Sequence, residues 1–224
     1  SPLGGPHGVW PQELDVSPLQ PLRATVVLDC AYAPLRLQGA PSLNADQRSR
    51  VWQIFSPNKA LGLTGVRAAY AIAPMDAESA VVALNALAPS WVVGAHGVAL
   101  LQAWVQPEVQ AWLGESLQTL RRWKAQQIDM LTALGWTCLP SDANFFCAHP
   151  TDGPADDADL ATWAATLVQL RHMGIKLRDT ASFGLSGYAR LGVLPPSAQE
   201  ALRSALIHIK AQPPASAKIV AFTP

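Results

Sequence analysis

The segment from Phe55 to Arg67 concentrates side chains that could bind an anion and react with a carbonyl compound. Lys59 carries a primary amine, which can form an imine with an aldehyde or sit beside a phosphate. Ser56 and Arg67 are residue types that bind phosphate, because a hydroxyl donates one hydrogen bond and a guanidinium can donate two in parallel. Two glycines in the same segment would let a ligand approach the backbone closely. Spacing alone leaves open the alternative of an ordinary surface loop with an exposed lysine.

An acidic residue ends the first apolar run of the chain. Residues 25–29 are β-branched and apolar on both faces, so we expect a buried parallel strand with Asp29 at its end. A buried carboxylate is costly unless it is paired, and a pyridinium nitrogen would be a suitable partner. Tyr32 follows three residues later. An aspartate that caps a turn or a helix explains the same local pattern, and both interpretations stay open.

Two arginines of the second half, Arg178 and Arg190, fall in predicted strands at 175–178 and 188–193. An arginine that points inward from a strand requires a carboxylate or a phosphate as its partner. The alternative is an intramolecular salt bridge, for which Asp179 is an adjacent candidate.

The elements that must position these residues alternate between strand and helix. We expect further strands at 51–55, 69–73 and 144–148, and helices at 76–87, 107–134, 157–173 and 197–210. Asp76 and Ser197 are the expected N-caps of two helices, and Gly135 and Gly174 the expected ends of two. This order favours an α/β sheet in the first half and a smaller α+β lobe in the second, with the change inside helix 107–134.

The composition is that of a globular protein and excludes several classes of partner. Half of the 224 residues are hydrophobic and 14% are charged, which argues against disorder. Sixteen basic and sixteen acidic residues cancel, so the charge gives no reason to expect nucleic acid or an anionic membrane as a partner. Three widely spaced cysteines indicate reduced thiols rather than a disulfide framework or a metal site. No apolar run reaches transmembrane length and the N-terminus is not a signal peptide, so we expect a cytoplasmic protein.

Taken in order along the chain, these residues resemble the fold-type-I pyridoxal-phosphate (PLP) aminotransferases, the aspartate-aminotransferase superfamily. The resemblance lies in Asp29-Cys30-Ala31-Tyr32, Ser56-Pro57-Asn58-Lys59, Arg67 and Arg190. Within that superfamily, the run Lys59–Tyr70 and the segments Asn144–Phe146 and Gly174–Arg178 look most like histidinol-phosphate aminotransferase and its relative threonine-phosphate decarboxylase. The resemblance covers nearly the whole chain, and its specificity comes from the ordered set rather than from any single member.

The resemblance implies a role for each residue toward the PLP cofactor. Lys59 would hold the cofactor as a Schiff base and then move the α-proton of the substrate. Asp29 would keep the pyridine nitrogen protonated, and Tyr32 would donate to the phenolic oxygen of the ring. Ser56 and Arg67 would bind the phosphate.

The resemblance also implies the fold, the substrates and the assembly. Residues 1–115 would form part of a large PLP-binding domain with a mainly parallel sheet, and residues 116–224 a small α+β domain. Arg190 would bind the substrate α-carboxylate, and Arg178 a second anionic group such as a substrate phosphate. We therefore expect a homodimeric aminotransferase of amino-acid biosynthesis that acts on an amino acid, a phosphorylated one included, and a 2-oxo acid. Threonine-phosphate decarboxylation on the same scaffold is the alternative within the resemblance.

The chain departs from complete members of this group in two ways. It is much shorter, so we expect an N-terminally truncated member without the glycine-rich phosphate loop and the aromatic ring that stacks on the cofactor. Gly5 stands where the group has an asparagine that bonds the phenolic oxygen, and a glycine cannot make that bond. These departures keep open a catalytically inactive homologue, although the intact Lys59 argues against it. A separate phosphate-binding module is disfavoured because the Lys59 loop has neither GxxxxGK nor GxGxxG spacing.

Overall fold

The computed structural model describes residues 25–150 and 157–211, so the expectation for Gly5 lies outside the described residues. The described chain divides into two compact units. The first comprises residues 25–121 and Ser141–Asn144, and the second comprises Arg122–Pro140 and the described residues from Phe145 on. The assignment of residues 1–115 and 116–224 to a cofactor domain and a small domain stays a prediction.

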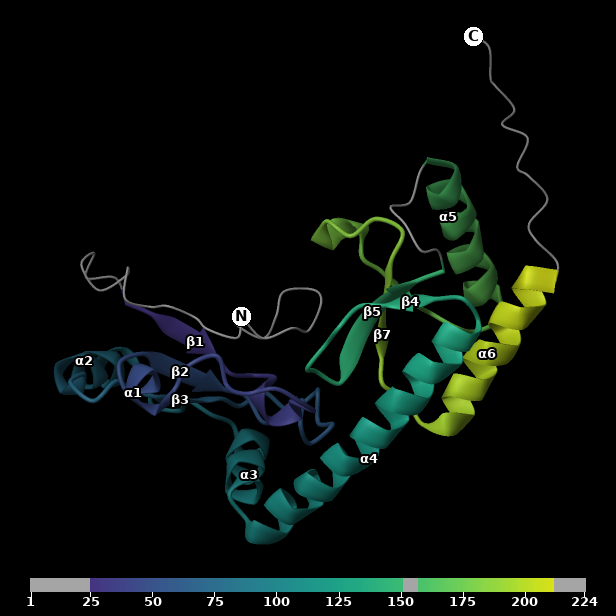
Figure 1. The fold of residues 1–224 in the computed structure, drawn as a ribbon. Coiled ribbons are helices and arrows are strands. Elements are labelled where there is room, and N and C mark those ends of the chain that lie inside the picture. Colours follow the sequence, from purple (N-terminus) through teal and green to yellow (C-terminus); the bar gives the residue numbers. More distant parts are fainter. Residues whose placement is uncertain (1–24, 151–156, 212–224) are drawn as a thin grey trace. The chain divides into compact units, whose positions relative to one another are not determined.

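The first unit is built on a three-stranded sheet in the order β1-β2-β3 (Figure 1). Its strands are β1 (Val27–Asp29), β2 (Trp52–Phe55) and β3 (Tyr70–Ile72). β1 pairs with β2 in parallel, as the sequence predicts, whereas β3 runs antiparallel to β2.

The predicted burial of β1 on both faces is wrong. Leu28 alone of its three residues is buried, while Val27 is 53% exposed and Asp29 is exposed. β1 is an edge strand of the described sheet. One face of the strand is covered, where Leu28 packs with Cys30, Leu43 and Val51. Packing on one face explains the alternating burial, because successive side chains of a strand point to opposite faces.

Four short helical elements and the start of a long helix accompany this sheet. They are the 3-10 turn η2 (Ala33–Leu35), α1 (Ala45–Arg48), α2 (Glu78–Leu87), α3 (Ala95–Trp104) and the long α4 (Pro107–Ala133). The predicted α4 is confirmed almost to the residue, and α3 leads into it (Figure 1). The predicted cap of α2 is wrong, since the helix starts at Glu78 behind Ala77 and has no side-chain cap. Asp76 lies one residue before the N-cap position, which Ala77 occupies.

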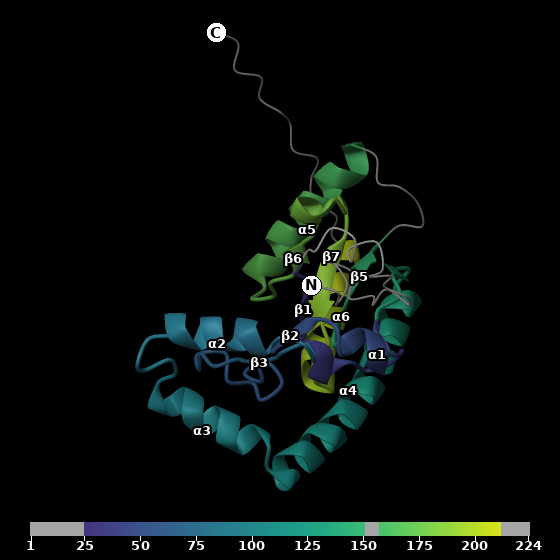
Figure 2. The same cartoon turned by 90° about the vertical axis from the view of Figure 1, so that its left-hand side faces the viewer.

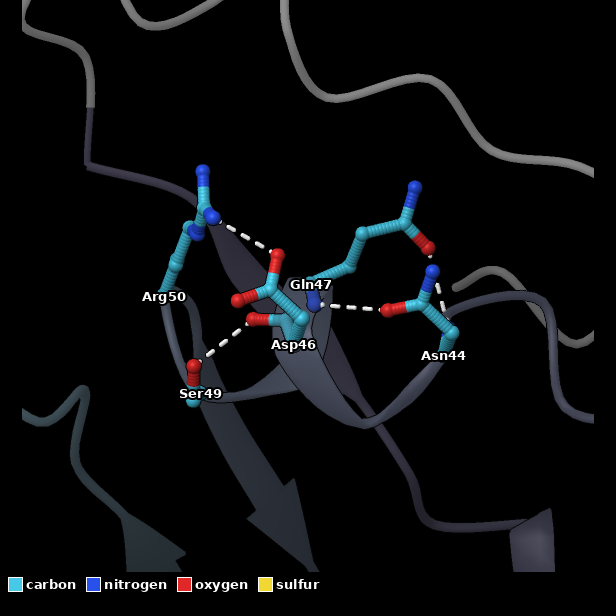
Figure 3. Close-up of polar contacts among 5 residues, drawn as sticks. All are labelled: Asn44, Asp46, Gln47, Ser49 and Arg50. Carbon is cyan, nitrogen blue, oxygen red and sulfur yellow. Dashed lines mark hydrogen bonds and ion pairs between the residues drawn. The ribbon is translucent and has the colours of Figure 1, made fainter.

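Helix α1 shows how local bonds can hold a helix that is too short to be stable by itself. Asn44 and Gln47 form a capping box, in which each side chain accepts from the backbone N–H of the other at 2.9 Å (Figure 3). Arg50 forms an ion pair with Asp46 at 2.6 Å across the same turn. The two capping-box bonds satisfy backbone N–H groups that a helix start leaves without partners. Together with the ion pair, they shape the connection between β1 and β2.

The second unit is an antiparallel sheet with helices, which confirms the predicted α+β architecture. Its strands are β4 (Thr137–Cys138), β5 (Phe145–His149), β6 (Arg178–Asp179) and β7 (Ala189–Gly192), in the order β4-β5-β7-β6. Figure 2 shows β5, β7 and β6 next to one another. Helices α5 (Asp157–His172) and α6 (Pro196–Ala211) contact each other along one side of this sheet (Figure 1).

Two boundaries in this unit differ from expectation and two agree. α6 begins at Pro196, so Ser197 lies in its first turn and is not its cap. β6 is confined to two residues, because the chain from Gly174 to Leu177 makes no ladder. Gly135 and Gly174 follow α4 and α5 with φ of 83° and 79°, the left-handed conformation expected where a helix ends.

Within residues 25–150 and 157–211, no helix combines the length and the apolar character that a bilayer crossing needs. The same residues contain no cluster of three or more histidine, cysteine or acidic side chains arranged to hold a metal ion.

Candidate functional site

Lys59 lies in one helical turn that closes the loop after β2. The backbone N–H of Leu63 donates to the carbonyl of Asn58 at 2.8 Å, and the N–H of Gly62 donates to the carbonyl of Lys59 at 3.3 Å. This pair of bonds is a Schellman motif, which needs a left-handed residue at the position before its end. Gly62 has φ of 68° and fills that position. The turn therefore fixes the backbone from which the lysine side chain extends.

A buried asparagine next to the lysine orients the predicted hydroxyl ligand. The Oγ of Ser56 donates to Oδ1 of Asn58 at 2.6 Å, and Asn58 is only 6% exposed. The sequence analysis missed Asn58, because an asparagine in a predicted loop is typical of any turn. Its burial is the feature that distinguishes it, and burial cannot be read from its type or spacing.

Three of the predicted residues line one pocket of about 520 Å³: Ser56, Lys59 and Arg67. The other described lining residues are Asn58, Thr64, Ala68, Ala69, Val92 and Val93. Two cations and two hydroxyls therefore face this pocket, and no carboxylate is among its described lining residues. This is a donor set for a dianion such as a phosphate monoester.

Tyr32 lies beside the lysine, whereas Asp29 does not share its pocket. The Nζ of Lys59 is 4.7 Å from the centroid of the Tyr32 ring. Asp29 is exposed, and its Oδ1 accepts from the N–H of Ala31 at 2.9 Å. Asp29 lines a neighbouring pocket of about 350 Å³ together with Arg36 and Arg48. The expectation of a buried carboxylate is wrong, because the end of β1 packs on one face only.

In the second unit, Arg178 and Arg190 lie directly opposite each other. They are register partners of β6 and β7, so both side chains belong to the same face of the sheet. The guanidinium of Arg178 lies over Phe183 at 4.7 Å, and that of Arg190 over Phe145 at 4.3 Å. Within the described residues neither arginine forms an ion pair.

The salt bridge considered for Arg178 is therefore not formed within the described residues. The adjacent Asp179 instead accepts from the N–H of Ala181 with its Oδ1 at 3.1 Å. Among the residues that the structure describes, no carboxylate forms an ion pair with either guanidinium.

A buried glutamine of α4 fixes the end of the strand that carries Arg190. The Nε2 of Gln127 donates to the carbonyl of Gly192, and its Oε1 accepts from the N–H of Leu194, both at 3.1 Å. Gln127 is 1% exposed, so these bonds replace the ladder contacts that the strand loses where it ends. The sequence analysis treated position 127 as an ordinary helix residue and missed this link.

The cysteines are not candidates for nucleophiles. Burial, and for Cys30 also the neighbouring Asp29, raises the pKa of the Cys30 and Cys138 thiols from 9.0 to about 11. Burial also raises the pKa of Cys147. Since the thiolate is the reactive form, these thiols are inert near neutral pH.

Comparison with known proteins identifies relatives over most of the chain. Residues 11–209 match the family "Aminotransferase class I and II". The histidinol-phosphate aminotransferase of Acetobacter pasteurianus is 30% identical over 190 residues, which are 84% of this chain and 49% of that protein. The chain thus spans about half the length of this relative.

Two solved structures share the fold. The histidinol-phosphate aminotransferase of Clostridium acetobutylicum aligns with a TM-score of 0.66 at 17% identity, over 88% of this chain and 57% of that one. The L-threonine-O-3-phosphate decarboxylase of Porphyromonas gingivalis aligns with a TM-score of 0.62 at 23% identity, over 94% of this chain and 63% of that one.

Proposed function

Because the chain belongs to the aminotransferase class I and II family, whose members use PLP, we propose that it serves as part of a PLP-dependent aminotransferase. The reaction would transfer an amino group between an amino acid and a 2-oxo acid, in amino-acid biosynthesis. Histidinol phosphate is the type of substrate named for the relative from Acetobacter pasteurianus, so a phosphorylated amino compound is our first choice. Residues 1–115 would serve the cofactor and residues 116–224 would form the small domain.

The observation that carries this proposal is the common pocket of Lys59, Ser56 and Arg67. PLP presents an aldehyde and a phosphate, and this pocket offers a primary amine for the first. For the second it offers the guanidinium of Arg67, the hydroxyl of Thr64 and, once its bond to Asn58 is exchanged, the hydroxyl of Ser56. The donor set therefore fits the group. When bound, PLP would act as an electron sink for negative charge at the substrate Cα.

The residues around the pocket would position the cofactor and move one proton. Lys59 would hold the aldehyde carbon and, once released, accept the α-proton at Nζ. Tyr32, whose ring lies 4.7 Å from that Nζ, would bind the phenolic oxygen. Ser56 and Arg67 would bind the phosphate. Asp29 lines a different pocket, and its proposed role of keeping a proton on the pyridine nitrogen rests on the resemblance alone.

Arg190 and Arg178 are our choice for the anionic groups of the substrate. Two arginines that lie opposite each other and have no ion pair in the described part of the chain fit a substrate that carries both a carboxylate and a second anion such as a phosphate. A planar guanidinium also orients a carboxylate through two parallel bonds, which a lysine could not do.

We also propose a homodimer and a cytoplasmic location. Apolar side chains are exposed from α2 to the start of α3, including Val82, Leu84, Leu87, Trp91 and Val92. Such a continuous apolar stretch is typical of a protein interface. All three cysteines lie in the described part and form no disulfide, which suits a reducing compartment.

Titration of the chain with PLP, followed by visible absorption, tests the lysine. We expect Lys59→Ala to abolish the absorption of lysine-bound cofactor, while Lys176→Ala, which removes an exposed lysine of the second unit, leaves it unchanged. Equal absorption in the wild type and in Lys59→Ala would reject the proposal. Circular dichroism of both variants controls for loss of the fold.

Threonine-phosphate decarboxylation is the second candidate, and the opposed arginines suit its substrate as well. The two reactions differ in which bond at Cα breaks. An assay of the full-length protein with threonine phosphate labelled in its carboxyl group would release labelled carbon dioxide only in the decarboxylase.

A further inference from the structure

Gly97 occupies the first turn of α3, where a glycine is unfavourable. A glycine inside a helix costs about 1 kcal/mol relative to alanine. The described helices contain a matched case in Gly114 of α4, which is exposed, whereas Gly97 is buried. Helix propensity alone would favour alanine at both positions, so the buried glycine calls for a separate reason.

The space around the two glycines supplies that reason. A Cβ at Gly97 would lie 2.5 Å from Cγ1 of Val93, 3.0 Å from the carbonyl oxygen of Arg67 and 3.2 Å from Cβ of Ala68. A Cβ at Gly114 would meet nothing within 4 Å. The first turn of α3 therefore packs directly on the carbonyl of Arg67 and the methyl group of Ala68. An added Cβ would displace Val93 and press against both of these groups.

All three contacted residues belong to the wall of the Lys59 pocket: Arg67, Ala68 and Val93. We propose that Gly97 is a positioning residue for the phosphate-binding part of this pocket. By setting the distance between α3 and the Arg67 segment, it sets where the guanidinium of Arg67 stands relative to Lys59. The identity of the ligand as the PLP phosphate rests on the proposed function, whereas the packing does not.

A methyl group at position 97 requires two adjustments, and both change the pocket. Val93 must rotate, but a β-branched side chain has few alternative χ1 angles and Val93 is itself part of the wall. In addition, α3 and the Arg67 segment must separate by some tenths of an ångström to relieve the contacts with the Arg67 carbonyl and with Ala68. A shift of that size is enough to weaken bidentate guanidinium bonds, which depend on geometry.

The test compares Gly97→Ala with the matched control Gly114→Ala, using PLP and pyridoxal as ligands. The two ligands share the aldehyde and the ring and differ only in the phosphate. We expect Gly97→Ala to weaken PLP binding about tenfold, the loss of roughly one charge-assisted hydrogen bond. Its affinity for pyridoxal should stay at the wild-type value. Gly114→Ala should bind both ligands like the wild type and melt at the same or a higher temperature.

The outcomes separate this inference from the proposed function. Unchanged PLP affinity in Gly97→Ala, or equal losses for PLP and pyridoxal, would overturn the positioning role. A wild-type chain that captures both ligands with equal affinity would overturn the phosphate role of this wall and leave Lys59 in place. A wild-type chain that captures neither would overturn the proposed function and the ligand assignment. In that case a melting temperature of Gly97→Ala below that of Gly114→Ala would still support the packing.

A double variant distinguishes the two contacts that matter most. Val93→Ala in the Gly97→Ala background removes the contact with Cγ1 but keeps the contact with the Arg67 carbonyl. A persistent loss of PLP affinity would support the spacing between α3 and the Arg67 segment. Recovery to the wild-type affinity would locate the effect in Val93 alone and overturn the spacing. Should Gly97→Ala fail to unfold cooperatively, the PLP affinity of the double variant, compared with that of the wild type, tests the spacing in its place.

Discussion

At the scale of single residues, the second unit places two positively charged side chains, Arg178 and Arg190, directly opposite each other on neighbouring strands. Like charges directly opposite in an antiparallel pair destabilise a sheet, and Arg178 and Arg190 form such a pair without an ion pair in the described residues. Each guanidinium lies over an aromatic ring, which offsets part of the repulsion. A bound anion would relieve the rest, which is the role that we propose for this pair toward the substrate.

Replacing Arg178 with glutamine tests the repulsion. The loss of the contact with Phe183 depends little on salt, whereas the relief of repulsion is screened by salt. We therefore take the free energy of unfolding of the variant minus that of the wild type. This difference should be about 0.5 kcal/mol more favourable to the variant at low salt than at high salt. Urea unfolding at both salt concentrations measures this difference.

Lys176→Gln is the matched control, since it removes one charge from an exposed residue nearby. The same salt-dependent gain in both variants would assign the effect to the overall charge of the unit and contradict a specific pair.

The sequence could identify the reactive residue types but not their environments. Type and spacing single out Lys59, Ser56 and Arg67 as candidates, and the resemblance implies their roles. The structure places all three on one pocket. The exposure of Asp29 could not be predicted, because it depends on which face of β1 the rest of the fold covers. The pairing of Arg178 with Arg190 depends on strand register, which two isolated apolar runs do not specify.

At the scale of elements, the turn that carries Lys59 depends on one glycine. Gly62 has a left-handed backbone, and nothing lies within 4 Å of a Cβ built on it. A substitution there is therefore penalised by backbone conformation alone. Gly65 in the same loop also has open space but no positive φ, which makes it a control for the general effect of a glycine-to-alanine change.

We expect Gly62→Ala to lower the free energy of unfolding by about 1 kcal/mol, since the left-handed conformation costs an alanine 1–2 kcal/mol. Gly65→Ala should stay within about 0.5 kcal/mol of the wild type. Chemical denaturation of the two variants side by side gives both values. Equal stability of the two variants would mean that the turn does not need its left-handed residue.

The elements that the sequence predicted well are those with strong periodicity. Helix α4 repeats its apolar residues every three to five positions and was predicted over almost its full length. Helix α3 was missed, because it is apolar and small on most sides and carries Gly97 in its first turn. Both features weaken the contrast between faces on which a prediction of helix depends. The contact of α3 with Arg67 is a tertiary contact, which a local sequence pattern does not predict.

At the scale of the whole molecule, the proposed roles fall into the two units. The candidates for cofactor binding lie in the first unit, and the opposed arginines lie in the second. The family match runs through both units, from residue 11 to residue 209. The chain nevertheless spans about half the length of the relative from Acetobacter pasteurianus. A direct test of the account should therefore ask whether this length of chain assembles the lysine site.

Reduction with borohydride after incubation with PLP, followed by peptide mapping, is that test. Borohydride converts an imine between the lysine amine and the aldehyde into a stable secondary amine, so the modified peptide identifies the residue. We expect one labelled peptide, carrying the adduct on Lys59, and none after treatment of Lys59→Ala. A label spread over several lysines, or no label on the Lys59 peptide, would contradict the assignment of this pocket as the PLP site.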